Sequence, residues 1–509
     1  MSARPTFRGA VGWSYVMTSG EKGIYALVTF VLASILGPSD FGTVAMAMVY
    51  ILFIQMFLEQ GLTVALIQRK DLDSKHFDSV FWMVMAFSLA LVGVSVGLSG
   101  WWAKANHLPA LASIIRWLSA SILIEALAVV QKAVLLRDMD FKSLSLRSNG
   151  AAALGGAVGI GMALGGLGVW ALVGQKLGED IAALALLWKV SHWRPRFQFS
   201  LRHLKQLLGF SIAQLFTKVA VFTNRYSTAL VLGLFFGPVT VGLYRLAEKL
   251  VGIVIDFGTT PLQFVAFPQF SRFQDNPGAL RQSVLTCLRL GSILTVPALA
   301  GLAAVGSPLM AVMGEKWAPA ANGLRILCVL GMVEVLTRFA ETLLPAVSRP
   351  HHLATLKWVQ CVVTVGLLVV MSLVLKGSTV GREVVGIALA QFAAGGLLFG
   401  PLLIFFLMRL SGLSSKVLVS TIWPSFLAAA AAAGVVGGLA VSGLLQSLRP
   451  VFVLSAEVVV GGVVGGAVLW AFDSQLKNEI VGLASRVFQH EEAGVPGGLS
   501  NGSAADPTV

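Results

Sequence analysis

Long apolar segments recur along almost the whole chain, and they constrain its fold more than any other feature. Each is about 20 residues long, the length at which an α-helix crosses the roughly 30 Å hydrocarbon core of a bilayer. Hydrophobic residues make up 56% of the sequence and charged residues only 12%, whereas soluble domains carry roughly 25% charged residues. Segments such as residues 425–445 lack the two-residue alternation of membrane β-strands. The sequence therefore predicts an all-α, polytopic membrane protein.

The apolar segments divide the chain into a series of expected membrane crossings separated by short polar loops. We expect fourteen helices, at residues 11–35, 41–67, 77–100, 110–131, 148–168, 170–188, 206–234, 239–267, 283–313, 319–345, 353–375, 383–408, 419–446 and 451–472. The remaining C-terminal residues are polar and too poor in apolar side chains to bury a core. This tail, at residues 474–509, is expected to be cytoplasmic and disordered.

The distribution of basic residues predicts how the helices are oriented. Cytoplasmic loops carry the excess of lysine and arginine in membrane proteins. With the N-terminus placed in the cytoplasm, the expected outside loops carry only Lys104, Lys316, Lys376, Arg382 and Arg449. Both termini are therefore predicted to be cytoplasmic, and the net charge of +13 marks topology rather than a nucleic-acid partner. The three cysteines lack the spacing of a metal site and are expected to be apolar fillers, so no cofactor is predicted.

A short sequence repeat relates the two halves of the chain. The stretch that begins at Gly37-Pro38 contains Gly42 and Ala47, and the stretch that begins at Gly237-Pro238 contains Gly242 and Ala247, each at an offset of 200. Leu62 and Leu262 match at the same offset. A Gly-Pro turn alone could explain part of the similarity, but the matching position between the first and second helix of each half favours duplication of a six-helix unit.

The repeat predicts two pseudo-symmetric six-helix lobes with an axis along the membrane normal, as in transporters with parallel repeats. The expected domains are residues 1–200 for the first lobe, 201–410 for the second lobe and 411–473 for two additional C-terminal helices.

Several expected helices carry ionisable residues, which are costly in a bilayer and usually face a water-filled path or a partner. Some have simpler explanations. Glu334 with Arg338 and Lys176 with Asp180 lie four residues apart and could neutralise one another. Arg289 could extend to the lipid headgroups. Lys218, Arg225 and Arg245 lack an obvious acid in the same helix turn, apart from Glu248 beside Arg245. Because arginine and lysine bind phosphate through charge-assisted hydrogen bonds, these cations predict an anionic cargo group.

Four stretches carry a resemblance to a known family: "ILGPSDFGTVAMAMVYILFIQMFLEQGLTVALIQR", "LGLFFGPVTVGLYRLAEKL", "VAFPQFSRFQDN" and "MGEKWAPAANGLRILCVLGMVE". They resemble the polysaccharide transporter family, the O-antigen, colanic-acid and exopolysaccharide flippases of the multidrug/oligosaccharidyl-lipid/polysaccharide superfamily. The similarity covers roughly residues 10–410. It implies a two-lobed bundle of twelve to fourteen helices in the bacterial inner membrane that moves undecaprenyl-diphosphate-linked oligosaccharides to the periplasmic leaflet by ion-coupled alternating access.

The resemblance also implies which residues line the transport path, because related flippases use helices one, two, seven and eight. The residues expected to bind the diphosphate or oligosaccharide are Lys22, Lys218, Arg225, Arg245 and Lys249. The carboxylates expected to couple transport to H⁺ or Na⁺ are Glu21, Glu59, Glu248 and Asp256.

The expected partners are the lipid-linked cargo, membrane lipids and the polysaccharide polymerase or export machinery. A drug or cation antiporter of the same superfamily is the alternative transporter, and it would need an acidic or aromatic pocket. An enzyme such as a polymerase or ligase is disfavoured because no large outer loop and no nucleotide- or metal-binding motif is found.

Overall fold

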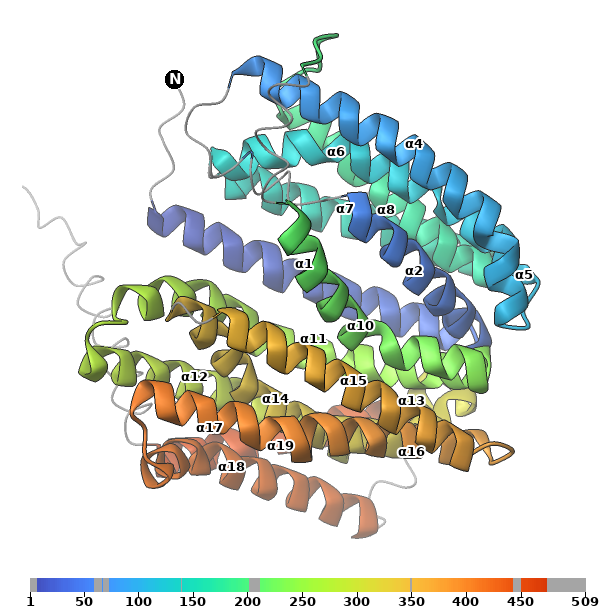
Figure 1. Cartoon of the computed structure of the whole chain (residues 1–509). Helices are drawn as coiled ribbons and strands as arrows, with labels where there is room; N and C mark the ends of the chain where they lie inside the picture. The colour runs from blue at the N-terminus through green and yellow to red at the C-terminus, as the bar shows by residue number, and fades with distance from the viewer. Residues whose placement is uncertain are drawn as a thin grey trace, which may run out of the picture.

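A computed structural model describes residues 7–58, 66, 73–138, 140–200, 211–347, 350–442 and 450–473 of this 509-residue chain. These residues form long helices (Figure 1), and the described part of the chain contains no strand. The helices are α1 (Phe7–Ile35), α2 (Pro38–Leu58), α4 (Ser74–Ala105), α5 (Ala110–Leu118), α6 (Ala120–Arg137), α7 (Phe141–Leu164), α8 (Val169–Val190), α10 (Ser211–Phe235), α11 (Pro238–Arg272), α12 (Pro277–Ala304), α13 (Gly306–Met313), α14 (Ala321–Ala346), α15 (Pro350–Val374), α16 (Val380–Gln391), α17 (Gly400–Ser411), α18 (Ser415–Ser442) and α19 (Pro450–Phe472). A 3₁₀ helix, η1 (Glu315–Ala320), and a π-helix, η2 (Phe392–Phe399), complete the set.

The helices pack as two bundles. We define the first bundle as α1, α2 and α4 to α8, and the second bundle as α10 to α17; α18 and α19 pack against α12 of the second bundle. Figure 1 shows α1, α2, α10 and α11 in the middle of the molecule, where the bundles meet. Within the described ranges, nine helical segments are long and apolar enough to cross a membrane. The predicted all-α polytopic fold is confirmed, and the number of fourteen crossings stays a prediction.

The two Gly-Pro sequences start the two helices that form the centre of the molecule. Pro38 begins α2 and Pro238 begins α11, and proline is favoured in the first helical turn because it has no N–H group to leave unpaired. Gly237 has a φ of +87°, a left-handed conformation that other residues adopt only with strain. The carboxylate of Asp40 accepts a hydrogen bond from the Gly37 backbone N–H at 3.1 Å.

Helices α2 and α11 cross at the two glycines that the repeat aligns. A Cβ atom on Gly42 would lie 1.7 Å from the carbonyl oxygen of Pro238, and a Cβ on Gly242 would lie 1.8 Å from the carbonyl oxygen of Pro38. The contacts are reciprocal, as expected where a pseudo-twofold axis passes between two copies of one unit. No side chain fits between the backbones, so glycine is required at both positions.

Three expected helices are not single regular α-helices in the structure. The predicted helix at 110–131 is wrong as a single element, because α5 ends at Leu118 and α6 begins at Ala120. The predicted helix at 283–313 is wrong as a single element, because it ends at Ala304 and a second helix, α13, begins at Gly306. The predicted helix at 383–408 is continuous only through the π-helical segment η2. The three cysteines are buried, in agreement with their prediction as apolar fillers.

Arg289 corrects another expectation. Its guanidinium does not extend to the headgroups but lies 3.7 Å from the carboxylate of Asp473, directly after α19, and both side chains are more than nine-tenths buried. A buried arginine is stable only when it is paired. The pair therefore joins the C-terminal helices to α12.

Candidate functional site

The charged residues of the central helices lie where the two bundles face one another, and we call them the interbundle site. It comprises Lys22 and Tyr25 from α1, Arg225 and Tyr226 from α10, Arg245, Glu248, Lys249 and Asp256 from α11, and Arg338 from α14.

Asp256 of α11 forms ion pairs with residues of two other helices, α1 and α14. Its carboxylate lies 2.9 Å from the Lys22 ammonium of the first bundle and 2.9 Å from the Arg338 guanidinium of the second. The exposed fractions of these side chains are 21% for Asp256, 30% for Lys22 and 28% for Arg338. The triad is therefore only partly buried, and in it two cations share one carboxylate and leave a net positive charge.

Lys249 lies about two helical turns before Asp256 on the same helix and faces the first bundle. Its ammonium is 6.0 Å from the ring centroid of Tyr25, a distance at which a cation is attracted to the ring face. The Tyr25 hydroxyl in turn donates a hydrogen bond to the carboxylate of Glu179 on α8. The Lys249 side chain is exposed, and no carboxylate of the described residues lies within ion-pair distance of it. Lys249 is thus an accessible cation on the face between the bundles.

A second group of cations surrounds Tyr226. The Arg245 guanidinium lies 5.6 Å from the ring centroid of Tyr226 and 2.5 Å from a carboxylate oxygen of Glu248. The Arg225 guanidinium lies 5.9 Å from the same ring, and its side chain is exposed. In the described part of the chain, Arg225 has no carboxylate partner. The site therefore presents one neutralised arginine and one free arginine around an aromatic ring.

An aromatic row extends from Tyr226 towards the first bundle. The ring of Phe222 lies 4.7 Å from Tyr226 and 5.6 Å from Phe53 of α2, and Phe53 lies 5.4 Å from Phe57. The seam between α2 and α10 is therefore aromatic, whereas the seam between α1 and α11 is held by the pair between Lys22 and Asp256.

The structure places the predicted site residues unevenly. It brings Lys22, Arg225, Arg245, Lys249, Glu248 and Asp256 to the interbundle site. Glu21 is half-buried on α1 and forms no ion pair with any described residue. Glu59 lies outside the described residues, and so does the side chain of Lys218, although its backbone belongs to α10.

The pairings predicted within single helices are only partly confirmed. Lys176 and Asp180 form the expected pair at 2.6 Å. The predicted pair of Glu334 with Arg338 is wrong, because Arg338 binds Asp256 on the neighbouring helix instead. Sequence reasoning missed Tyr25, Tyr226 and Arg338 as parts of the site. Tyr25 could have been found, since it lies four residues after Glu21 and hence on the same face of its helix.

The bundles are in closest contact at the end where α2 and α11 begin, which we call the Gly-Pro end. The fully buried Trp317 of η1 donates a hydrogen bond from Nε1 to the carbonyl of Ala33 at 2.7 Å. The neighbouring Lys316 donates to the carbonyls of Ser34 and Ile35 at 3.2 and 3.1 Å. A lysine at this position complements the negative C-terminal end of the α1 dipole. Segment 315–317 of the second bundle therefore caps the last turn of α1 in the first.

Known proteins share both sequence and fold with this chain. The family described as polysaccharide biosynthesis protein matches residues 31–322. The succinoglycan biosynthesis transport protein ExoT of Rhizobium meliloti is 28% identical over 70% of this chain and 72% of its own length. The lipopolysaccharide biosynthesis protein WzxC of Escherichia coli is 25% identical over 69% of this chain and 72% of its own.

Solved structures share the fold at low sequence identity. An inward closed conformation of the lipid II flippase MurJ aligns with a TM-score of 0.71 at 13% identity, covering 92% of this chain and 99% of the other. An inward-facing multidrug resistance transporter, itself described as a member of the MOP superfamily, aligns with a TM-score of 0.59 at 16% identity, covering 77% of this chain and 95% of the other.

Proposed function

Because the chain belongs to the family of polysaccharide biosynthesis proteins, we propose that it is a flippase that moves lipid-linked oligosaccharides across a membrane. The relatives ExoT and WzxC are named for the synthesis or transport of bacterial polysaccharides. The proposal rests on Lys249 and Arg225, two exposed cations that have no carboxylate partner in the described part of the chain. Both lie between bundles whose fold is that of a lipid flippase.

The chemistry of the cargo follows from these cations. A diphosphate bears several negative charges and hydrogen-bond acceptors, and arginine and lysine bind such groups strongly in a low-dielectric site. Lys249 and Arg225 would hold the diphosphate, and Tyr226 offers a flat apolar surface beside them. In this proposal Lys22 and Arg338 become available to the cargo only when they separate from Asp256. Binding of the anion would thereby loosen the contact between α1 and α11.

Coupling to an ion gradient is a further part of the proposal. Among the four predicted carboxylates, Asp256 and Glu248 are each bound to a cation, and Glu59 lies outside the described residues. Glu21 has no ion pair in the described part of the chain, so it is the carboxylate best placed to exchange H⁺ or Na⁺. We also propose that the protein resides in the bacterial inner membrane with both termini in the cytoplasm, and that it works beside a polysaccharide polymerase or export complex.

A drug or cation antiporter is the competing function, and the charge of the site argues against it. A cationic drug would meet Lys249 and Arg225, neither of which has a compensating carboxylate among the described residues, and such an arrangement is repulsive. The named relatives are polysaccharide proteins, and the fold neighbours are transporters rather than enzymes.

Complementation tests the proposal directly. The chain is expressed in a bacterium that lacks its own polysaccharide flippase, and exported polysaccharide is measured. We expect export to be restored, and to fall at least about tenfold, or about 1.4 kcal/mol, in the variant Arg225→Ala. The matched control is Arg382→Ala, an exposed arginine at the start of α16. Toxin resistance without restored polysaccharide export would favour the antiporter instead.

A further inference from the structure

The segment that follows α8 is fixed to the first turns of α4 by specific hydrogen bonds. The Arg196 backbone N–H donates to Oδ1 of Asp78 at 3.0 Å, and the Ser200 N–H donates to the Ser79 hydroxyl at 2.9 Å. Trp82 Nε1 donates to the Arg196 carbonyl at 2.8 Å. Segment 191–200 is therefore held in a defined position. It lies at the end of the molecule opposite the Gly-Pro end, because α4 begins there and α8 ends there.

One atom of this surface lacks a partner. Asp78 is only 1% exposed, and its second carboxylate oxygen, Oδ2, has no hydrogen-bond partner in the described part of the chain. Asp78 lines a pocket of about 270 Å³ together with His192, Trp193, Arg194, Pro195 and Arg196. A buried carboxylate oxygen without a donor is unfavourable, because it has lost its water and gained nothing in return. The pocket thus presents an acceptor that a ligand with N–H groups would satisfy.

The rim of the same pocket is cationic. Arg194 is already occupied, since its guanidinium donates to the carbonyls of Trp188, Ser191 and Trp193 at 2.5 to 2.8 Å and caps the end of α8. Arg196 uses only its backbone in the contacts with Asp78 and Trp82, and its side chain is exposed. The exposed Arg196 side chain, which has no ion pair within the described residues, therefore belongs to the lining of the same pocket as the Asp78 carboxylate. A ligand that complements both must carry a cationic donor and an anion close together.

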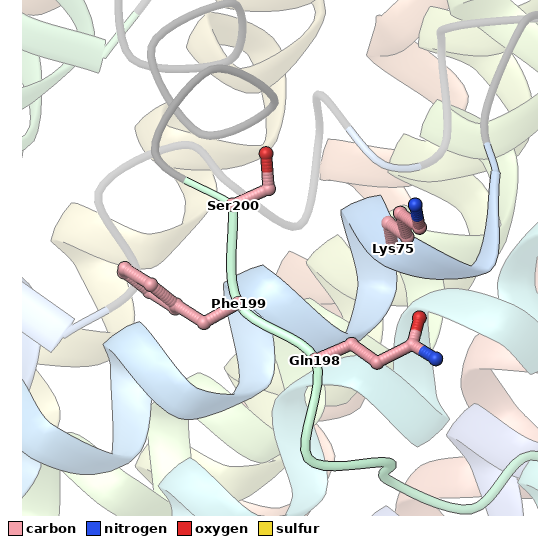
Figure 2. A pocket seen from close by; sticks show the side chains of 4 residues that line it. All are labelled: Lys75, Gln198, Phe199 and Ser200. Atoms are coloured by element: carbon pink, nitrogen blue, oxygen red, sulfur yellow. The ribbon is translucent and has the colours of Figure 1, made fainter.

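Exposed aromatic side chains place this surface beside the membrane. The Phe197 side chain is 92% exposed and stacks on Trp82 with ring centroids 4.7 Å apart. The Phe199 side chain is 55% exposed. Tryptophan is enriched at the membrane–water interface, and the exposed apolar rings beside Trp82 favour contact with lipid. An adjoining pocket of about 350 Å³ is lined by Lys75, Gln198, Phe199 and Ser200, and Figure 2 shows the Phe199 ring pointing away from Lys75.

We propose that the pocket between Asp78 and Arg196 binds the headgroup of a phospholipid that carries a primary ammonium and a phosphate, as phosphatidylethanolamine does. The ammonium donates to Oδ2 of Asp78, and the phosphate lies against the Arg196 guanidinium. The acyl chains extend past Phe197 and Phe199 into the bilayer. The site is remote from the interbundle site and does not depend on the cargo proposed there. Its bound lipid fastens segment 191–200 to the membrane surface.

Native mass spectrometry of the full chain in detergent tests this proposal. The probes are three lipids with identical acyl chains: phosphatidylethanolamine, phosphatidylcholine, whose ammonium has no N–H group, and phosphatidylglycerol, which has a phosphate but no amine. We expect phosphatidylethanolamine to bind about tenfold more tightly than either of the others. Equal retention of the three lipids would overturn the proposal.

Two variants separate the parts of the site. Asp78→Asn keeps an oxygen for the Arg196 N–H but turns the unpaired acceptor into a donor, so it should lower only the affinity for phosphatidylethanolamine, about tenfold. Arg196→Gln leaves the backbone contacts intact and should weaken both phosphatidylethanolamine and phosphatidylglycerol. Asp275→Asn, an exposed acid in the turn after α11, is the control and should change nothing. Unchanged lipid retention in both test variants would contradict the proposal.

Two further measurements establish whether the Asp78 variant folds and whether the acyl chains take part in binding. Thermal unfolding in detergent without lipid shows whether Asp78→Asn is folded; if it is not, Arg196→Gln decides alone. Soluble glycerophosphoethanolamine should displace the lipid only weakly, because it lacks the acyl chains. If glycerophosphoethanolamine displaced phosphatidylethanolamine at an equal concentration, the ligand would be the free headgroup, and the assignment of a lipid would be wrong.

Discussion

The interface between the two bundles is built in two different ways along its length. At the Gly-Pro end, backbone meets backbone at Gly42 and Gly242, and the buried Trp317 and the exposed Lys316 bind the last carbonyls of α1. Further along the same helices, the interface consists of partly exposed charges around Asp256 and Lys249. The first region leaves no room for a cargo, whereas the second is accessible and cationic. In a transporter that opens alternately to the two sides of the membrane, the helices at the Gly-Pro end must move apart before a cargo bound in the charged region can leave on that side.

The largest expected effect comes from the tight contact. In Gly242→Ala, the new methyl group would overlap the carbonyl of Pro38, so the helices must move apart. Overpacking of this kind costs about 1–3 kcal/mol or more. We expect transport by the variant to fall at least about tenfold, or 1.4 kcal/mol, in reconstituted vesicles. Gly252→Ala, on the same helix with no neighbour within 4 Å, is the control and should transport normally. Normal transport by Gly242→Ala would show that the contact is not needed.

The charged region should respond next. Asp256→Asn leaves Lys22 and Arg338 facing one another without their shared carboxylate, so the free energy of unfolding should fall. Because a fifth to a third of each side chain is exposed, we expect a loss of about 1–2 kcal/mol rather than the larger value of a fully buried pair. Thermal unfolding measures it. Lys22→Met in the same background should restore part of the loss, and strictly additive effects of the two changes would contradict a direct interaction.

An effect no larger than that of Asp256→Asn is expected for the hydrogen bond of the buried tryptophan. Trp317→Phe removes the N–H group that donates to Ala33 and leaves that carbonyl unpaired. The free energy of unfolding should fall by about 1–2 kcal/mol through the lost hydrogen bond and the smaller ring. Trp101→Phe, at a position that is 65% exposed, is the matched control, with little expected change. An equal effect at both positions would show that the contact between η1 and α1 contributes nothing specific.

The smallest effect concerns Lys316. Lys316→Met removes an exposed cation from the C-terminal end of α1, which should cost about 0.3–1 kcal/mol and less at high salt. Unfolding measured at low and high ionic strength distinguishes the contribution of the charge from that of packing. A loss that does not change with salt would show that packing of the lysine stem, not its charge, makes the contribution.

The sequence repeat identifies the two glycines that meet at the Gly-Pro end, although not their contact, whereas no sequence pattern identifies the ion pairs of the charged site. A repeat with an offset of 200 brings two glycines to equivalent places, and a symmetry axis then puts them together. Ion pairs follow no such rule, because any of several acids can meet a given cation once helices pack. Sequence spacing therefore pairs Arg338 with Glu334 on its own helix, although Arg338 binds Asp256 on another. Arg289 is wrongly expected at the headgroups for the same reason, since its partner Asp473 lies 184 residues away in the chain.

Translocation by the purified protein in liposomes tests the central account most directly. A polyprenyl-diphosphate oligosaccharide with a fluorescent sugar is placed in one leaflet, and its arrival in the other is followed by quenching. We predict that the wild type moves it and that the double variant Arg225→Gln with Lys249→Gln moves it at least about tenfold more slowly, about 1.4 kcal/mol. Equal rates for the two proteins would contradict the assignment of these cations as the site through which the diphosphate passes.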